Sequence, residues 1–130
     1  DTEVSRRYYL ADARFLVGLE GDDLDLLSEL HETLRDPHWL LYLGRKAFVP
    51  GEPVWLPDGL RPDETLLHAL RGHAWLGPEW REPPERLRLV LEDEEGSEVR
   101  PDQPLSFAER RFAPRRVRVK FVSLPRAKEV

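Results

Sequence analysis

Val-Arg-Val-Lys-Phe-Val, residues 117–122, alternates apolar and charged side chains more regularly than any other part of the chain. When the preceding Arg116 is included, a period of two places three apolar side chains on one face of a strand and three cations on the other. These two sets are Val117, Val119 and Phe121 against Arg116, Arg118 and Lys120. We therefore predict a strand here, with its apolar face in the core.

The segment before this strand predicts a second strand and a turn. Residues 86–92 alternate in the same way, and Glu94-Glu95-Gly96-Ser97 has the composition of a turn. Residues 73–84 show no clear period, and we expect a loop there.

Two helices and a further strand are predicted in the first half of the chain. One helix begins after Asp22 or Asp23, which can cap it, and ends at about Arg35, before Pro37. A second helix runs from Asp63 to about Arg71, and Gly72 closes it. Residues 9–19 alternate as a half-buried strand, and residues 39–50 read as a loop that enters a short strand.

Composition is that of one folded domain. The 130 residues are 40% hydrophobic and 35% charged, and no apolar run approaches the roughly 20 residues of a membrane span. Cys is absent, which excludes disulfides, thiolate catalysis and Cys-based zinc sites and agrees with a cytoplasmic location. The chain has no Met, so we expect it to be part of a longer protein. The order of elements predicts an α+β fold with helices on one face of a mainly antiparallel sheet.

Charge is segregated along the sequence. The net charge is -5, yet residues 110–120 contain six cations and no carboxylate. An acidic protein can therefore present one basic face to nucleic acid. Arg111, Arg115, Arg116 and Arg118 are candidate phosphate contacts on this segment, and the alternative is a solvated strand face or an edge protected by cations.

Two motifs resemble one known family. Residues 9–17, Tyr-Leu-Ala-Asp-Ala-Arg-Phe-Leu-Val, are similar to the pattern Tyr-Leu-x-Asp-Ala-x-Phe-x-Val, and residues 42–46 with Pro50 resemble Tyr-Leu-Gly-Arg-Arg-Ser-Cys-Pro. Both patterns belong to the CasD-type subunit of the CRISPR surveillance complex Cascade, in the RAMP superfamily. A looser match covers residues 105–116. Ala47-Phe48 replaces the family's Ser-Cys, which leaves the role of these two positions open.

The resemblance implies the second half of a ferredoxin-like (RRM-like) fold plus a C-terminal extension with antiparallel strands. It assigns residues 1–58, with a glycine-rich loop, to the ferredoxin-like part and residues 59–130 to the extension. It also implies a subunit of type I-E Cascade that binds the 5′ handle of the guide RNA (crRNA) and contacts the backbone and large subunits, without a membrane or a cofactor.

The candidate RNA site is the segment around Gly44. A glycine lets backbone amides approach a phosphate, and Arg45 and Lys46 add a guanidinium fork and a mobile charge. Tyr42 can stack on an unpaired base. An ordinary turn with two solvated cations is the alternative.

Catalysis is the competing interpretation. A relative in the superfamily cleaves precursor RNA with Tyr, Lys and His, and Tyr42, Lys46 and His38 lie close in this sequence. The branch resembled is non-catalytic, so we expect no enzyme. We also expect no metal site, because the four histidines lack the spacing of known metal-binding motifs. A protein–protein docking module without RNA contacts is a third interpretation.

Overall fold

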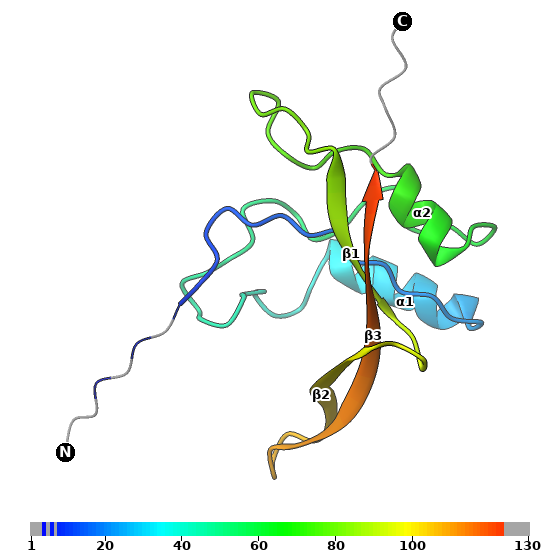
Figure 1. The fold of residues 1–130 in the computed structure, drawn as a ribbon. Coiled ribbons are helices and arrows are strands. Elements are labelled where there is room, and N and C mark those ends of the chain that lie inside the picture. Colours follow the sequence, from blue (N-terminus) through cyan, green and yellow to red (C-terminus); the bar gives the residue numbers. More distant parts are fainter. Residues whose placement is uncertain (1–3, 5, 7, 124–130) are drawn as a thin grey trace, which may run out of the picture. The chain divides into compact units, whose positions relative to one another are not determined.

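The computed structural model describes residues 4, 6 and 8–123 and contains two helices and three strands (Figure 1). In chain order they are α1 (Leu24–Arg35), α2 (Leu66–Gly72), β1 (Arg86–Glu92), β2 (Glu98–Ser106) and β3 (Arg111–Ser123). The strands form one antiparallel sheet. The predicted α+β class, with antiparallel strands in the C-terminal part, is confirmed.

The chain divides into two compact units. One contains residues 17–70, and the other contains residues 1–16 together with 71–130. The first unit holds α1 and the Gly44 segment, and the second holds the sheet. The predicted domain boundary between residues 58 and 59 stays a prediction.

The sheet has the order β1-β3-β2, so β3 is the central strand. β1 pairs with residues 117–123 of β3, and β2 pairs with residues 111–117. Val117 therefore has register partners on both sides, Glu92 of β1 and Glu98 of β2. It is also the one fully buried side chain among the described residues, at 0% exposure.

The turn between β1 and β2 is hydrogen-bonded to β3 next to Val117. The amide of Gly96 donates to Asp93 O (2.8 Å), and the amide of Asp93 donates to Arg116 O (3.2 Å). Arg116 Nη1 in turn donates to the carbonyl of Gly96 (3.0 Å). A Cβ at residue 96 would lie 2.4 Å from the backbone carbonyl of Val117. The close approach of these two backbones therefore requires glycine.

The predicted strands at residues 86–92 and 117–122 are confirmed, but the predicted core face is only partly correct. Val117 is buried and Val119 half-buried, whereas Phe121 is 65% exposed. The register places Phe121 opposite Arg88, on the exposed face of β1. Residues directly opposite each other in an antiparallel pair share a face. The half-buried Leu87, Leu89 and Leu91 of β1 therefore lie on the face of Arg118, Lys120 and Val122, and not on the face of Phe121.

β2 was not predicted, because Pro101 and Pro104 interrupt any strand pattern in its sequence. Proline lacks an amide donor and is tolerated at sheet edges. β2 is an edge strand, and its register shifts twice along β3. Only its pairing with β3 identifies it as a strand.

The predicted strand at residues 9–19 is wrong. Asp12 has φ 54°, in the left-handed region, which ends the extended path that the alternation suggested. No described segment pairs with residues 9–19, and Phe15, Val17 and Leu19 are exposed. A period-two pattern becomes a strand only where a partner strand supplies the hydrogen bonds.

The first helix forms as predicted. Asp23 is its N-cap and accepts a hydrogen bond from the amide of Leu26 (2.9 Å). The second helix begins at Leu66, three residues later than the predicted start at Asp63.

We predict that Gly96→Ala destabilises the protein by about 1–3 kcal/mol, because the new methyl group meets backbone atoms that cannot move aside independently. Urea unfolding measures the loss. Gly51→Ala is the control, since a Cβ at residue 51 has no atom within 4 Å. Equal stability of the two variants would contradict the close approach at Val117.

Candidate nucleic-acid interface

The segment around Gly44 is a short closed loop, residues 43–48. The amide of Leu43 donates to Phe48 O (2.8 Å), and the amide of Phe48 donates to Arg45 O (2.9 Å). Gly44 has φ 81°, a conformation that glycine adopts without strain. These bonds close the loop on itself, and the predicted short strand in residues 39–50 is therefore absent.

The loop presents its cations on an exposed surface. Arg45 lies with its guanidinium carbon 5.5 Å from the centre of the Phe48 ring, in a cation–π contact. Arg45 and Lys46 are exposed, and so is Tyr42 (48%). Four predicted site residues, Tyr42, Gly44, Arg45 and Lys46, thus share one small loop and its start.

Phe48 is a functional candidate that the sequence did not single out. It occupies one of the two positions where the chain departs from the Ser-Cys of the family it resembles. The structure gives the ring a definite neighbour, because it supports one face of the Arg45 guanidinium. The sequence does show an arginine three residues before a phenylalanine. It does not show that the loop closes and brings the two side chains together.

The four arginines predicted on residues 111–118 do not form a row of uncommitted cations. Arg115 makes a bidentate pair with Asp102, with Nε–Oδ1 at 2.9 Å and Nη2–Oδ2 at 2.7 Å, and its Nη1 lies 3.5 Å from Glu92. Hydrogen bonding from Arg115 lowers the pKa of Asp102, and the same bond raises the pKa of Arg115. Arg115 therefore ties β3 to both edge strands.

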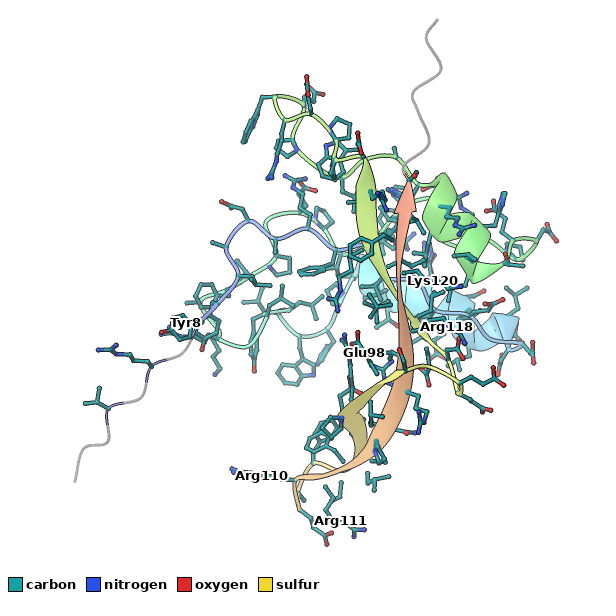
Figure 2. The ribbon with its side chains drawn as sticks, viewed as in Figure 1. Tyr8, Glu98, Arg110, Arg111, Arg118 and Lys120 are labelled. Carbon is teal, nitrogen blue, oxygen red and sulfur yellow. The ribbon has the colours of Figure 1, made fainter. Side chains whose placement is uncertain are left out.

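Arg118, Arg116 and Arg111 also have partners. Arg118 forms an ion pair with Asp93, whose pKa is lowered first by that hydrogen bond and then by the amide of Glu95. Arg116 donates to Gly96, and Arg111 lies 3.2 Å from Glu109. Figure 2 places Arg118 in the part of β3 near β1 and Arg111 at the far end of the β2–β3 hairpin. A phosphate bound by Arg115 or Arg118 would have to displace a carboxylate, and their RNA roles stay predictions.

Comparison with known proteins places the chain. A family model described as CRISPR-associated protein (Cas_Cas5) matches residues 1–118. The chain belongs to the Cas5 family. A solved structure described as "Crystal structure of Cas protein" is similar over 85% of the chain, with 44% sequence identity and a TM-score of 0.71. None of the curated proteins matches.

The present chain spans 56% of the length of that solved Cas protein. Family membership confirms the CRISPR-associated part of the resemblance. The CasD subtype and the type I-E complex stay predictions. In the described part of this Cas5 chain, no helix has the length and apolar character that crossing a membrane requires.

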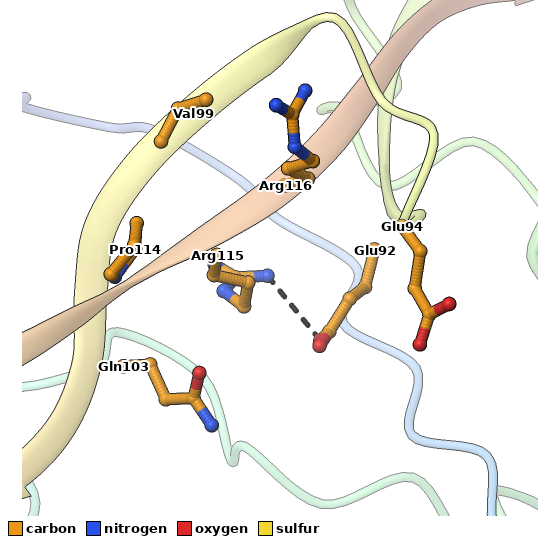
Figure 3. A pocket seen from close by; sticks show the side chains of 7 residues that line it. All are labelled: Glu92, Glu94, Val99, Gln103, Pro114, Arg115 and Arg116. Atoms are coloured by element: carbon orange, nitrogen blue, oxygen red, sulfur yellow. Dashed lines mark ion pairs between the residues drawn. The ribbon is translucent and has the colours of Figure 1, made fainter.

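The Cas5 sheet carries a shallow open pocket of about 480 Å³ on its β2–β3 side (Figure 3). Its lining combines two carboxylates and two guanidiniums with smaller side chains: Glu92, Glu94, Val99, Gln103, Pro114, Arg115 and Arg116. The ion pair between Arg115 and Glu92 crosses it. Opposite charges offset each other in this lining, so the pocket is poorly suited to a phosphate.

Two of the four histidines of this Cas5 chain, His31 and His38, pack against tryptophans. His31 Nε2 lies 2.9 Å from Leu56 O, and its ring packs 5.5 Å from that of Trp55. The His38 ring meets the edge of Trp39. Among the described residues, no group of three or more His, Cys, Asp or Glu side chains could hold a metal ion.

We predict that acid weakens this fold. The lowered pKa values of Asp93 and Asp102 mean that both stay ionised in the folded state at pH values where the unfolded chain takes up protons. Their contribution is present above the ordinary carboxyl pKa of about 4 and is lost as the pH falls through the folded-state values.

Urea unfolding measured from pH 6 down to pH 3 should therefore show falling stability, and Asp102→Asn should reduce the slope. Glu82→Gln, at an exposed loop position, is the control and should leave the slope unchanged. A slope in Asp102→Asn equal to that of the wild type would exclude the Asp102–Arg115 pair as a source.

Proposed function

We propose that this Cas5 chain is a non-catalytic RNA-binding part of the type I-E CRISPR surveillance complex, Cascade, and that it holds the 5′ handle of crRNA. The observation that carries the proposal is loop 43–48, which combines a left-handed glycine, an aromatic-supported arginine and a neighbouring lysine. Family membership supports a CRISPR-associated role. The subtype and the handle rest on the two sequence motifs.

The loop has the chemistry of a phosphate contact. Without a Cβ at residue 44, a phosphate oxygen can approach the backbone amides closely. Arg45 offers a planar fork that matches two phosphate oxygens, and Lys46 adds a mobile charge. Tyr42, at the start of the loop and 48% exposed, can stack on an unpaired base or contact its sugar.

The partners that fit this function are crRNA and the backbone and large subunits of the complex, in the cytoplasm and without a membrane. Sequence recognition of the target would belong to base pairing by the guide. The runner-up function is a metal-independent endoribonuclease that uses Tyr42, Lys46 and His38. A docking module without RNA contacts is the third.

We predict that Arg45→Ala/Lys46→Ala weakens binding of crRNA with an intact 5′ handle. Each phosphate contact on a single strand contributes about 0.7 to the slope of log Kd against log salt concentration. Loss of two contacts should therefore reduce this slope by about 1.4. Filter binding across a salt series measures the Kd and its dependence on salt. The matched control is Arg71→Ala/Arg81→Ala, which removes two charges from exposed positions outside the loop.

The same experiment separates the alternatives when the RNA is run on a gel afterwards. Uncut RNA and dependence on the handle support the proposal. Metal-independent cleavage that His38→Ala abolishes would replace it with the endoribonuclease function. Binding that the loop variant and the control weaken equally would reject a specific role for the loop.

We predict a smaller effect for Phe48→Ala. An exposed cation–π contact contributes about 0.5–1 kcal/mol, so its loss should weaken RNA binding about two- to fivefold. Phe48→Tyr should restore binding, since it keeps the ring. In the Arg45→Ala background, Phe48→Ala should have little further effect. Additive losses would show that Phe48 acts independently of Arg45.

A further inference from the structure

The outer part of the β2–β3 hairpin is a two-stranded ribbon that extends past the end of β1 (Figure 1). β1 reaches β3 only from Val117 onward, while the pairs Gln103–Ala113, Pro104–Phe112 and Ser106–Arg111 continue the ribbon to its tip. The amide of Arg110 donates to Phe107 O (3.3 Å), and the amide of Glu109 donates to Ser106 Oγ (3.2 Å). Arg110 has φ 53°, so the turn is tight and defined.

The tip exposes aromatic side chains. Phe107 is 77% exposed and Phe112 45%, and their rings form an edge-to-face pair with centroids 6.2 Å apart. Leu105 beside them is 59% exposed. Side chains this exposed add little to the stability of the ribbon, and clustered exposed apolar groups mark interaction sites.

The charge of the ribbon indicates the class of partner. Residues 98–120 contain seven cations and three carboxylates, in a chain whose net charge is -5. Arg115 is committed to Asp102 and Glu92, as shown above. At the turn, Arg111 pairs with Glu109, whereas Arg110 has no ion-pair partner among the residues that the structure describes. Figure 2 shows Arg110 and Arg111 together at the end of the hairpin.

We propose that this tip, with Phe107, Phe112 and Arg110, is a second contact for unpaired nucleic acid, separate from loop 43–48. An aromatic platform beside a cation is the combination that binds single strands, because bases stack on the ring and the arginine meets the phosphate. Arg100, Arg111, Arg115 and Arg118 are paired with carboxylates. The exposed Arg110, which has no ion-pair partner among the described residues, therefore favours a phosphate-bearing partner over a groove on a protein. The proposal does not depend on RNA binding by loop 43–48.

The test uses the 130-residue chain with three probes: short oligouridine, oligothymidine and an RNA duplex. Phe107→Ala/Phe112→Ala should weaken binding of the single strands about tenfold and leave the duplex unchanged. Arg110→Ala should flatten the salt dependence on single strands by about 0.7. Arg88→Ala/Phe121→Ala is the control, because it removes the same kinds of side chain from an exposed place on β1 and β3.

Each variant is also tested in the Arg45→Ala/Lys46→Ala background, where the tip effect should persist whether or not the loop binds RNA. Equal losses on RNA and DNA assign the tip to unpaired strands of either kind, and a loss on RNA alone assigns it to RNA. Arg110→Glu leaves the aromatic pair intact and tests the tip if the phenylalanine variant does not fold. Unchanged single-strand affinity in Arg110→Glu and in the phenylalanine variant would overturn the proposal and indicate a protein partner.

Discussion

The sheet of this Cas5 chain depends on the contact between Gly96 and Val117. At this point the turn after β1 meets the backbone of β3 so closely that a Cβ at residue 96 would overlap the Val117 carbonyl. Val117 is also the position at which β3 exchanges one partner strand for the other. The turn, the two edge strands and the one fully buried side chain therefore share a single junction.

This junction explains how the charges of the sheet are used. The end of β1, the turn after it and β2 bring Glu92, Asp93 and Asp102 within reach of Arg115 and Arg118 on β3. Hydrogen bonding in these pairs lowers the pKa of Asp93 and Asp102. Two arginines of the basic segment, Arg115 and Arg118, thus tie β3 to carboxylates of β1, β2 and the turn between them. The nucleic-acid contacts that we propose lie elsewhere, in loop 43–48 and at the tip of the β2–β3 hairpin.

The two candidate contacts both combine an arginine with aromatic residues, although their backbone structures differ. In loop 43–48 the aromatic ring of Phe48 supports Arg45, and two backbone hydrogen bonds fix their spacing. At the hairpin tip, Phe107 and Phe112 pack edge to face, and the amide of Arg110 in the same turn donates to Phe107 O. An arginine near an aromatic ring suits unpaired nucleic acid, because stacking and phosphate binding then occur side by side.

The sequence by itself determined the features that depend on near neighbours. A cap at Asp22 or Asp23 and the stop before Pro37 specified α1, the alternation specified β1 and the second half of β3, and the Gly44 motif indicated a turn with two cations. Tertiary structure decided everything that needs a distant partner. Residues 9–19 alternate but have no described strand to pair with, whereas β2 contains two prolines and still forms because β3 supplies its hydrogen bonds. The arginines of β3 looked alike in the sequence, and only the register showed which of them face a carboxylate. Periodicity shows which side chains share a face. Strand pairing, burial and charge neutralisation depend on which other segments of the chain lie next to that strand.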